Sequence, residues 1–224
     1  MAKYISNPNP YAKVLDKKFT HQFFLLFAVV CGAAGAYYIT TITSLSISLF
    51  GVGLIGVFVV LASKIFKQMG KNDRGENAEW QIKKILDELS DNYTVFQNVP
   101  IKSHLDVDFI LVGPTGVLAI EVKSHKGFNM YLKDKFIGQT FAEMMGLKEY
   151  LKSSGVDIYI QAALVFTGAF VKYYPPKKGV HVINKEYLLK LIDRSKKIKF
   201  DQALVEAAIS NLYSTKFEPS VRRK

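Results

Sequence analysis

Residues 19–63 contain no Asp, Glu, Lys or Arg, and this gap constrains the fold more than any other feature of the sequence. Two apolar runs, Phe23–Tyr38 and Leu45–Phe66, account for most of it. As helices of about 18 and 21 residues they would measure roughly 27 and 31 Å, close to the hydrocarbon thickness of a bilayer. The sequence therefore predicts two transmembrane helices over residues 22–66. A helical hairpin buried in a soluble core is the alternative, although soluble helices normally carry a polar face.

The distribution of basic residues predicts the orientation of this hairpin. The chain has a net charge of +11, and Lys or Arg residues flank the apolar runs in residues 1–21 and 64–74 but are missing between the runs. Cytoplasmic flanks of membrane helices are enriched in Lys and Arg, so both termini are expected in the cytoplasm. Residues 1–21 would be a basic cytoplasmic tail, with the lipid bilayer as a partner. The single cysteine, Cys31, excludes an internal disulfide.

Residues 73–224 combine helical and strand patterns in the manner of a globular α/β domain. Their order predicts an αβββαβ core followed by a small β-α-α extension. The predicted elements are helix 75–90, strands 93–99, 105–112 and 117–123, helix 139–153, strands 158–167 and 179–183, and helices 185–193 and 201–213.

The turn between the second and third predicted strands brings two carboxylates together. If Gly113–Gly116 form the loop that joins strands 105–112 and 117–123, Asp108 falls directly opposite Glu121. Side chains alternate between the two faces of a sheet, so both carboxylates are expected on one face. The other face is expected to be apolar and buried, and it comprises Val107, Phe109, Leu111, Leu118, Ile120 and Val122.

Two carboxylates that face each other across a strand pair repel, and a divalent cation would relieve this repulsion. Oxygen ligands on a rigid sheet suit Mg²⁺ or Mn²⁺. The same register places Asp106 opposite Lys123, so that Lys123 would stand beside the cation. The alternative is a solvated strand end on which Asp106 and Lys123 form a surface ion pair.

Glu79 adds a third carboxylate from the preceding helix. It lies three residues before Ile82, on the apolar face of the helix, and is expected to point toward the sheet. A buried carboxylate needs a partner, which favours a role in the same site. An exposed helix start is the alternative interpretation.

Four segments resemble a known family when they are taken together. They are Gly75–Glu79, Asp108–Pro114, Gly116–Lys123 and Ser124–Gly127, in that order. Over residues 73–190 the chain resembles the nuclease-related domain (NERD) family, which belongs to the restriction-endonuclease-like PD-(D/E)xK superfamily. The resemblance implies a restriction-endonuclease-like α/β fold. The chain departs from the family pattern at Ala78, where Gly is common, and in a short segment before Gln139.

The resemblance also implies a function and a set of site residues. The function is a Mg²⁺- or Mn²⁺-dependent nuclease that hydrolyses phosphodiester bonds in DNA, with RNA as the other possible substrate. Together with the two predicted transmembrane helices, this gives a membrane-anchored nuclease. A catalytically weak nucleic-acid-binding or scaffold protein at the membrane is the alternative. The implied catalytic residues are Asp108, Glu121, Lys123, Glu79 and Gln139, and the implied metal ligands are Asp108, Glu121 and the carbonyl of Val122.

Overall fold

The computed structural model divides the chain into two compact units. One unit comprises Met1–Pro8 together with Arg74–Lys224, and the other comprises Asn9–Asp73. The structure describes residues 1–6, 74–102, 105–128, 134–171, 175–195 and 201–215, with isolated helical positions between 22 and 34 and between 56 and 64.

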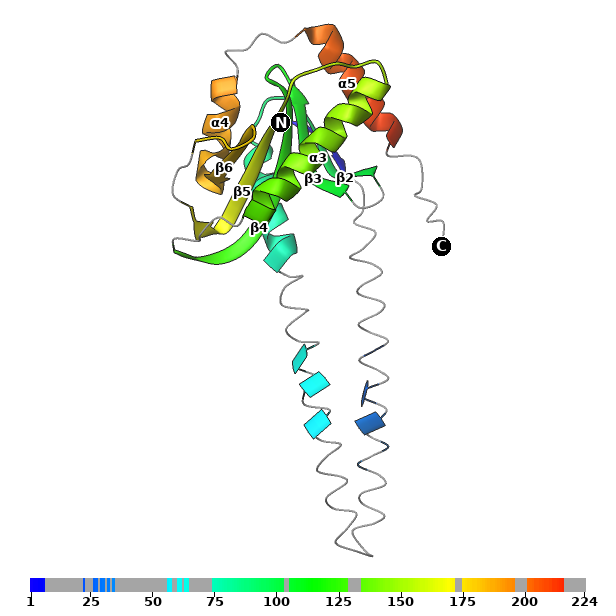
Figure 1. Cartoon of the computed structure of the whole chain (residues 1–224), viewed down its shortest axis with the longest axis vertical. Helices are drawn as coiled ribbons and strands as arrows, with labels where there is room; N and C mark the ends of the chain where they lie inside the picture. The colour runs from blue at the N-terminus through cyan, green and yellow to red at the C-terminus, as the bar shows by residue number, and fades with distance from the viewer. Residues whose placement is uncertain are drawn as a thin grey trace, which may run out of the picture. The chain divides into compact units, whose positions relative to one another are not determined.

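Among the described residues, six strands form one mixed sheet in the order β1-β2-β3-β4-β5-β6 (Figure 1). Residues 74–86 form the helix that precedes β2. The strands are β1 (Lys3–Ser6), β2 (Thr94–Lys102), β3 (Leu105–Gly113), β4 (Gly116–Phe128), β5 (Ile160–Phe170) and β6 (Val180–Asn184). The remaining helices are α3 (Asp134–Ser153), the 3₁₀ helix η1 (Lys185–Tyr187), α4 (Leu188–Ser195) and α5 (Gln202–Thr215).

This arrangement confirms the predicted mixed α/β class and the order of its elements. Strands β2, β3 and β4 pair antiparallel, whereas β4, β5 and β6 pair parallel. The parallel pairing of β4 with β5 is possible because α3 provides the long crossover between them.

The strand β1 was not predicted, because its residues were assigned to a basic tail. It pairs parallel with β2, from Lys3 opposite Thr94 to Ser6 opposite Gln97. The Tyr4 hydroxyl donates a hydrogen bond to the carbonyl oxygen of Lys83 at 3.1 Å, which ties the strand to the helix of residues 74–86. Burial raises the pKa of the Tyr4 hydroxyl, and the nearby Asp87 carboxylate adds a smaller increase.

The predicted localisation as a two-span membrane protein with cytoplasmic termini is not supported by the structure and is wrong. Among the residues that the structure describes, none of the helices combines the length and the apolar character that a bilayer span requires. Most of the predicted hairpin, residues 22–66, lies outside the described residues.

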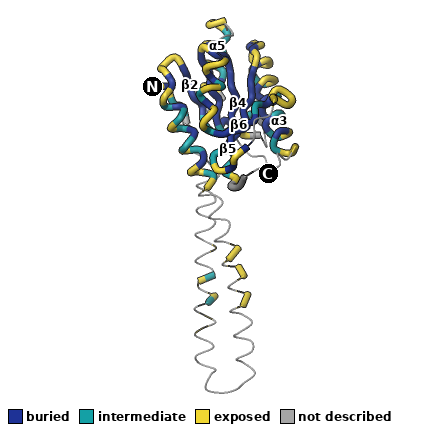
Figure 2. Tube along the Cα trace, turned by 90° about the vertical axis from the view of Figure 1, so that its left-hand side faces the viewer, coloured by how far each residue is buried: buried dark blue, intermediate teal, exposed yellow. Residues whose placement is uncertain are grey.

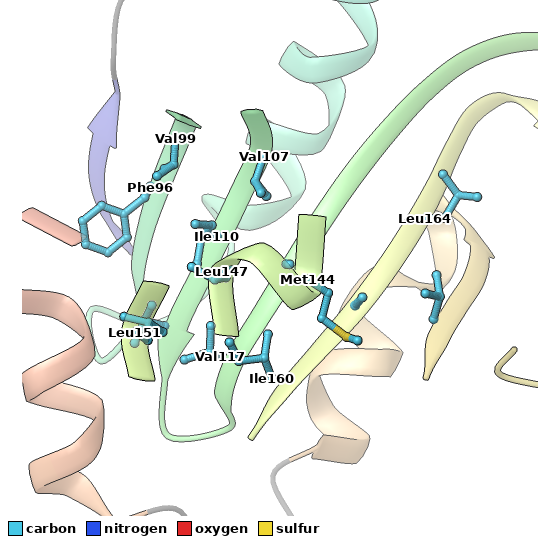
Figure 3. Packing of buried hydrophobic residues seen from close by; sticks show 14 of the residues in the cluster. Phe96, Val99, Val107, Ile110, Val117, Met144, Leu147, Leu151, Ile160 and Leu164 are labelled. Carbon is cyan, nitrogen blue, oxygen red and sulfur yellow. The ribbon is translucent and has the colours of Figure 1, made fainter. Parts of the chain in front are cut away.

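Helices cover both faces of the sheet. On one face, α3 and α5 pack over a core that includes Leu147, Leu151 and Leu212. Figure 3 shows Leu147 and Leu151 among the packed side chains. On the other face, the helix of residues 74–86 and α4 pack over a second core that includes Ile82 and Leu188. Figure 2 shows the buried strands between helices whose outer sides are exposed. Each fully buried Leu or Ile stabilises the fold by about 1.5–3 kcal/mol relative to an exposed one, so both layers hold the sheet rigid.

The β3–β4 turn has the predicted register. Val112 lies opposite Val117, and Gly113 lies opposite Gly116. Gly116 adopts a φ of 84°, which glycine reaches without the steric penalty of a Cβ atom. Gly113 is needed for another reason, because a Cβ atom there would lie 2.4 Å from Cδ1 of Tyr93. The two glycines therefore fix the hairpin that carries the candidate site.

One part of the predicted alternation is wrong. Val107 and Phe109 were predicted on one buried face; both are buried, but Phe109 belongs to the core under the helix of residues 74–86 and Val107 to the opposite core under α3. The change of face occurs at Asp108 and at Asn98 on β2, where the register passes over both residues and Asn98 has a φ of 54°. A left-handed residue interrupts the regular pleat, so strict alternation does not hold there.

Candidate active site

The candidate site lies where β3 and β4 part. Their pairing ends at Phe109 opposite Ile120, whereas β4 continues to pair with β5 beyond that point. The backbone N–H of Val122 donates a hydrogen bond to Asp108 Oδ2 at 2.7 Å. The Asp108 carboxylate therefore takes the place of a backbone acceptor at the end of the β3–β4 ladder.

Glu121 and Lys123 lie on the same face of β4, as the period of two requires. Glu121 is only 4% exposed. Its Oε1 forms an ion pair with Lys123 Nζ. Gln139 of α3 joins the pair, because its Nε2 donates to Glu121 Oε1 at 3.0 Å and its Oε1 accepts from Lys123 Nζ at 3.4 Å. The structure thus brings Glu121, Lys123 and Gln139 into one hydrogen-bonded group.

Glu143 is a site residue that the sequence analysis missed. It lies on α3, is 2% exposed, and accepts a hydrogen bond from Gln139 Nε2 at 2.8 Å. Burial raises the pKa of Glu143 to about 8, and the nearby Glu121 carboxylate contributes to the increase. Its position one helical turn before Leu147, on the buried side of α3, was the available signal.

Glu79 reaches the site from the opposite layer. It is half-buried, not part of an exposed helix start, and Gln97 Nε2 of β2 donates a hydrogen bond to its Oε2 at 3.3 Å. Burial raises the pKa of Glu79, partly opposed by the Gln97 hydrogen bond, while Glu76 and Glu121 raise it further. Gln97 was not singled out from the sequence, because nothing in its strand pattern distinguishes it.

Asp108 is electrostatically coupled to both layers of the fold. Burial raises the pKa of Asp108 well above its usual value, and the Glu121 carboxylate raises it further. The hydrogen bond from Val122 opposes this increase, as does the charge of Lys123. The Glu79 carboxylate also raises the pKa of Asp108. Three carboxylates from different elements therefore repel one another around Asp108, as expected of a site that gathers negative charge.

Asp106 and Lys123, both among the described residues, do not form the surface ion pair that was the alternative interpretation. It is exposed and pairs in register with Pro100 of β2. The Lys123 ammonium forms its ion pair with Glu121 instead. The interpretation of Lys123 as one half of a surface pair with Asp106 is therefore wrong.

The oxygen atoms of the site can be compared with the ligands that a divalent cation requires. The buried Oε2 atoms of Glu121 and Glu143 receive no hydrogen bond, which is costly for a carboxylate unless another cation or donor occupies the space. In the described part of the chain, no three His, Cys, Asp or Glu side chains are arranged to hold a metal ion by themselves. The carboxylates of Asp108 and Glu121, the backbone carbonyl of Val122 and water still form a donor set that Mg²⁺ accepts, because Mg²⁺ commonly retains several waters. The residues present fit such an ion.

Comparison with known proteins gives the family of this region. A nuclease-related domain (NERD) model matches residues 74–167. No curated protein matches the chain. One similar solved structure is that of Pyrococcus furiosus SfsA in complex with Ca²⁺, with 18% sequence identity, a TM-score of 0.27, and coverage of 62% of this chain and 53% of that chain. The similarity thus spans about half the length of SfsA and carries no argument about the site. The family model spans all the site residues described above, so the candidate site lies within the part of the chain that is similar to nuclease-related domains.

Proposed function

We propose that this protein is a divalent-metal-dependent nuclease that hydrolyses phosphodiester bonds in DNA. The observation that carries the proposal is the convergence of Asp108, Glu121 and Lys123 where β3 and β4 part, within a nuclease-related domain. A cluster of buried carboxylates beside an ammonium group is suited to a reaction in which negative charge increases on a phosphate.

Asp108 and Glu121 would hold Mg²⁺ or Mn²⁺, together with the carbonyl oxygen of Val122. When bound, the ion would polarise the phosphate and lower the pKa of an attacking water. Asp108 is already oriented by the Val122 N–H, and Glu121 by Lys123 and Gln139. These contacts hold the carboxylates in place before any ligand arrives, which reduces the reorganisation that binding requires.

Lys123 would donate hydrogen bonds to the phosphate and orient the attacking water. Its ammonium carries three donors, and the contacts with Glu121 and Gln139 use two of them. Glu79 would hold a water molecule from the other side of Asp108, since it lies near enough to raise the pKa of that carboxyl. Gln139 would hold the side chains of Lys123 and Glu121 in fixed positions through its hydrogen bonds to both.

Cleavage of DNA by the full-length protein tests this proposal. We expect cleavage with Mg²⁺ or Mn²⁺ and none with EDTA, and we expect Asp108→Asn to abolish it. Asp91→Asn is the matched control, because Asp91 is an exposed turn residue before β2. Metal-independent cleavage, or an active Asp108→Asn variant, would contradict the assignment. Running RNA in parallel identifies the nucleic acid that is preferred.

A catalytically weak nucleic-acid-binding or scaffold protein is the second candidate. The ion pair between Lys123 and Glu121 favours it, because the ammonium neutralises a carboxylate that a metal would otherwise use. This candidate predicts that DNA binding is the same with EDTA as with Mg²⁺, and that no cleavage accompanies it. The nuclease predicts cleavage that depends on the metal.

A further inference from the structure

Gln139 uses its entire side-chain amide within the site. Its Nε2 donates to Glu121 Oε1 at 3.0 Å and to Glu143 Oε1 at 2.8 Å. Its Oε1 accepts from Lys123 Nζ at 3.4 Å. A primary amide has two N–H donors, so both are used. Carboxylates on one side and an ammonium on the other therefore define which way the amide faces.

Glu143 supplies one of these two acceptors from within the fold. It follows Gln139 by four residues on α3, which places both side chains on one helix face. It is also 2% exposed, so water does not readily replace it as an acceptor. Without Glu143, Gln139 Nε2 would keep only the bond to Glu121. The amide could then rotate and turn its oxygen away from Lys123.

We propose that Glu143 is a positioning residue, which fixes the Gln139 amide so that Gln139 holds Lys123 and Glu121 in place. The kinetic consequence rests on the proposed nuclease function, whereas the structural consequence does not. The competing explanation is that Glu143 only fills space between α3 and the sheet. The two explanations differ in whether the effect of a substitution at Glu143 passes through Gln139.

Substitutions that remove or keep the acceptor separate these explanations. Glu143→Met keeps the length of the side chain but has no strong acceptor, whereas Glu143→Gln keeps a carbonyl oxygen. We expect Glu143→Met to lower kcat about 100-fold with little change in KM, as a misplaced catalytic group does. Glu143→Gln should restore most of this loss. Glu149→Met is the matched control, because Glu149 is an exposed glutamate of the same helix.

A double-mutant cycle tests the route through Gln139. In a Gln139→Leu background, Glu143→Met should produce no further loss, because the residue through which it acts is already gone. Additive losses would overturn the proposal, as would failure of Glu143→Gln to restore activity.

The Gln139 side-chain amide gives a readout that does not depend on cleavage. Its resonances can be followed in full-length protein labelled with ¹⁵N-glutamine and assigned with Gln139→Leu. We expect slow amide hydrogen exchange in wild type and Glu143→Gln, and at least about tenfold faster exchange in Glu143→Met, since one hydrogen bond is lost. Unchanged exchange in Glu143→Met would overturn the positioning role even if the protein cleaves DNA. Faster exchange in a protein that cleaves nothing would support the positioning role and refute the nuclease.

Discussion

The backbone N–H of Val122 is bonded to the carboxylate of Asp108, at 2.7 Å, rather than to a backbone carbonyl. A side chain thereby continues the strand pairing one step beyond the point where β3 and β4 separate. This relationship makes Asp108 part of the sheet as well as part of the candidate site. Substitutions at Asp108 must therefore be separated into those that keep the acceptor and those that remove it.

Asp108→Asn and Asp108→Ala should differ in stability although both lose activity. Asn keeps an oxygen for the Val122 N–H and removes a charge that repels Glu121, so its free energy of unfolding should stay within about 1 kcal/mol of wild type. Ala leaves the N–H without its acceptor and should cost about 1–3 kcal/mol. Urea denaturation in EDTA measures both. Equal stabilities of the two variants would show that this hydrogen bond does not hold β4.

Lys123→Met should lower the rate of cleavage and also destabilise the fold. The loss of a charge-stabilising donor should reduce kcat by about 10²–10³. Because Glu121 is buried and loses its ion partner, the free energy of unfolding should fall by roughly 1–3 kcal/mol, less than for a fully buried pair since Gln139 still donates to Glu121. Adding Glu121→Gln should restore stability but not activity. Lys152→Met, on the exposed end of α3, should change neither quantity.

The stability of the metal-free protein should depend on pH through Glu143. Its pKa of about 8 in the folded state exceeds the usual value of 4.5, so the folded chain holds a proton that the unfolded chain has lost between these pH values. The contribution of Glu143 to the free energy of unfolding should therefore be fully present at pH 4.5 and below, and be lost as the pH rises to about 8. Glu143→Gln should reduce this slope, leaving the part due to Asp108 and Glu79, and should be more stable than wild type at pH 9 by up to about 5 kcal/mol. A wild-type protein that gains stability over this range would refute the assignment.

Gly113→Ala should destabilise the domain through the Tyr93 ring. The added Cβ atom would lie 2.4 Å from Cδ1 of Tyr93, so the ring or the turn must shift. Overpacking of this kind costs about 1–3 kcal/mol. Gly138→Ala is a suitable comparison, because nothing lies within 4 Å of the new Cβ and alanine favours the helix. Thermal melts should show Gly113→Ala below wild type and Gly138→Ala at or slightly above it.

The features that could be predicted from the sequence depend on residues close together in the chain. The features that could not be predicted depend on contacts between distant elements. The register of Val112 opposite Val117 follows from two local signals, the glycines of the turn and the apolar alternation of the strands. The change of face at Asn98 does not, because alternation assumes a regular pleat. Glu143 was not predicted as a site residue, because Glu121 becomes its neighbour only when α3 packs beside β4. Contacts between distant elements, not local patterns, complete the site.

The strand β1 has a consequence for the order in which the sheet can form during synthesis. Lys3 pairs beside Thr94, so β1 is synthesised about 90 residues before its partner strand β2 and has no partner until β2 has also been made. The helix of residues 74–86, which anchors Tyr4 through Lys83, also appears late. Contacts between such distant segments form slowly, because a long loop must close first. The edge of β2 thus stays open in the nascent chain until β1 pairs with it, although β1 is synthesised before β2.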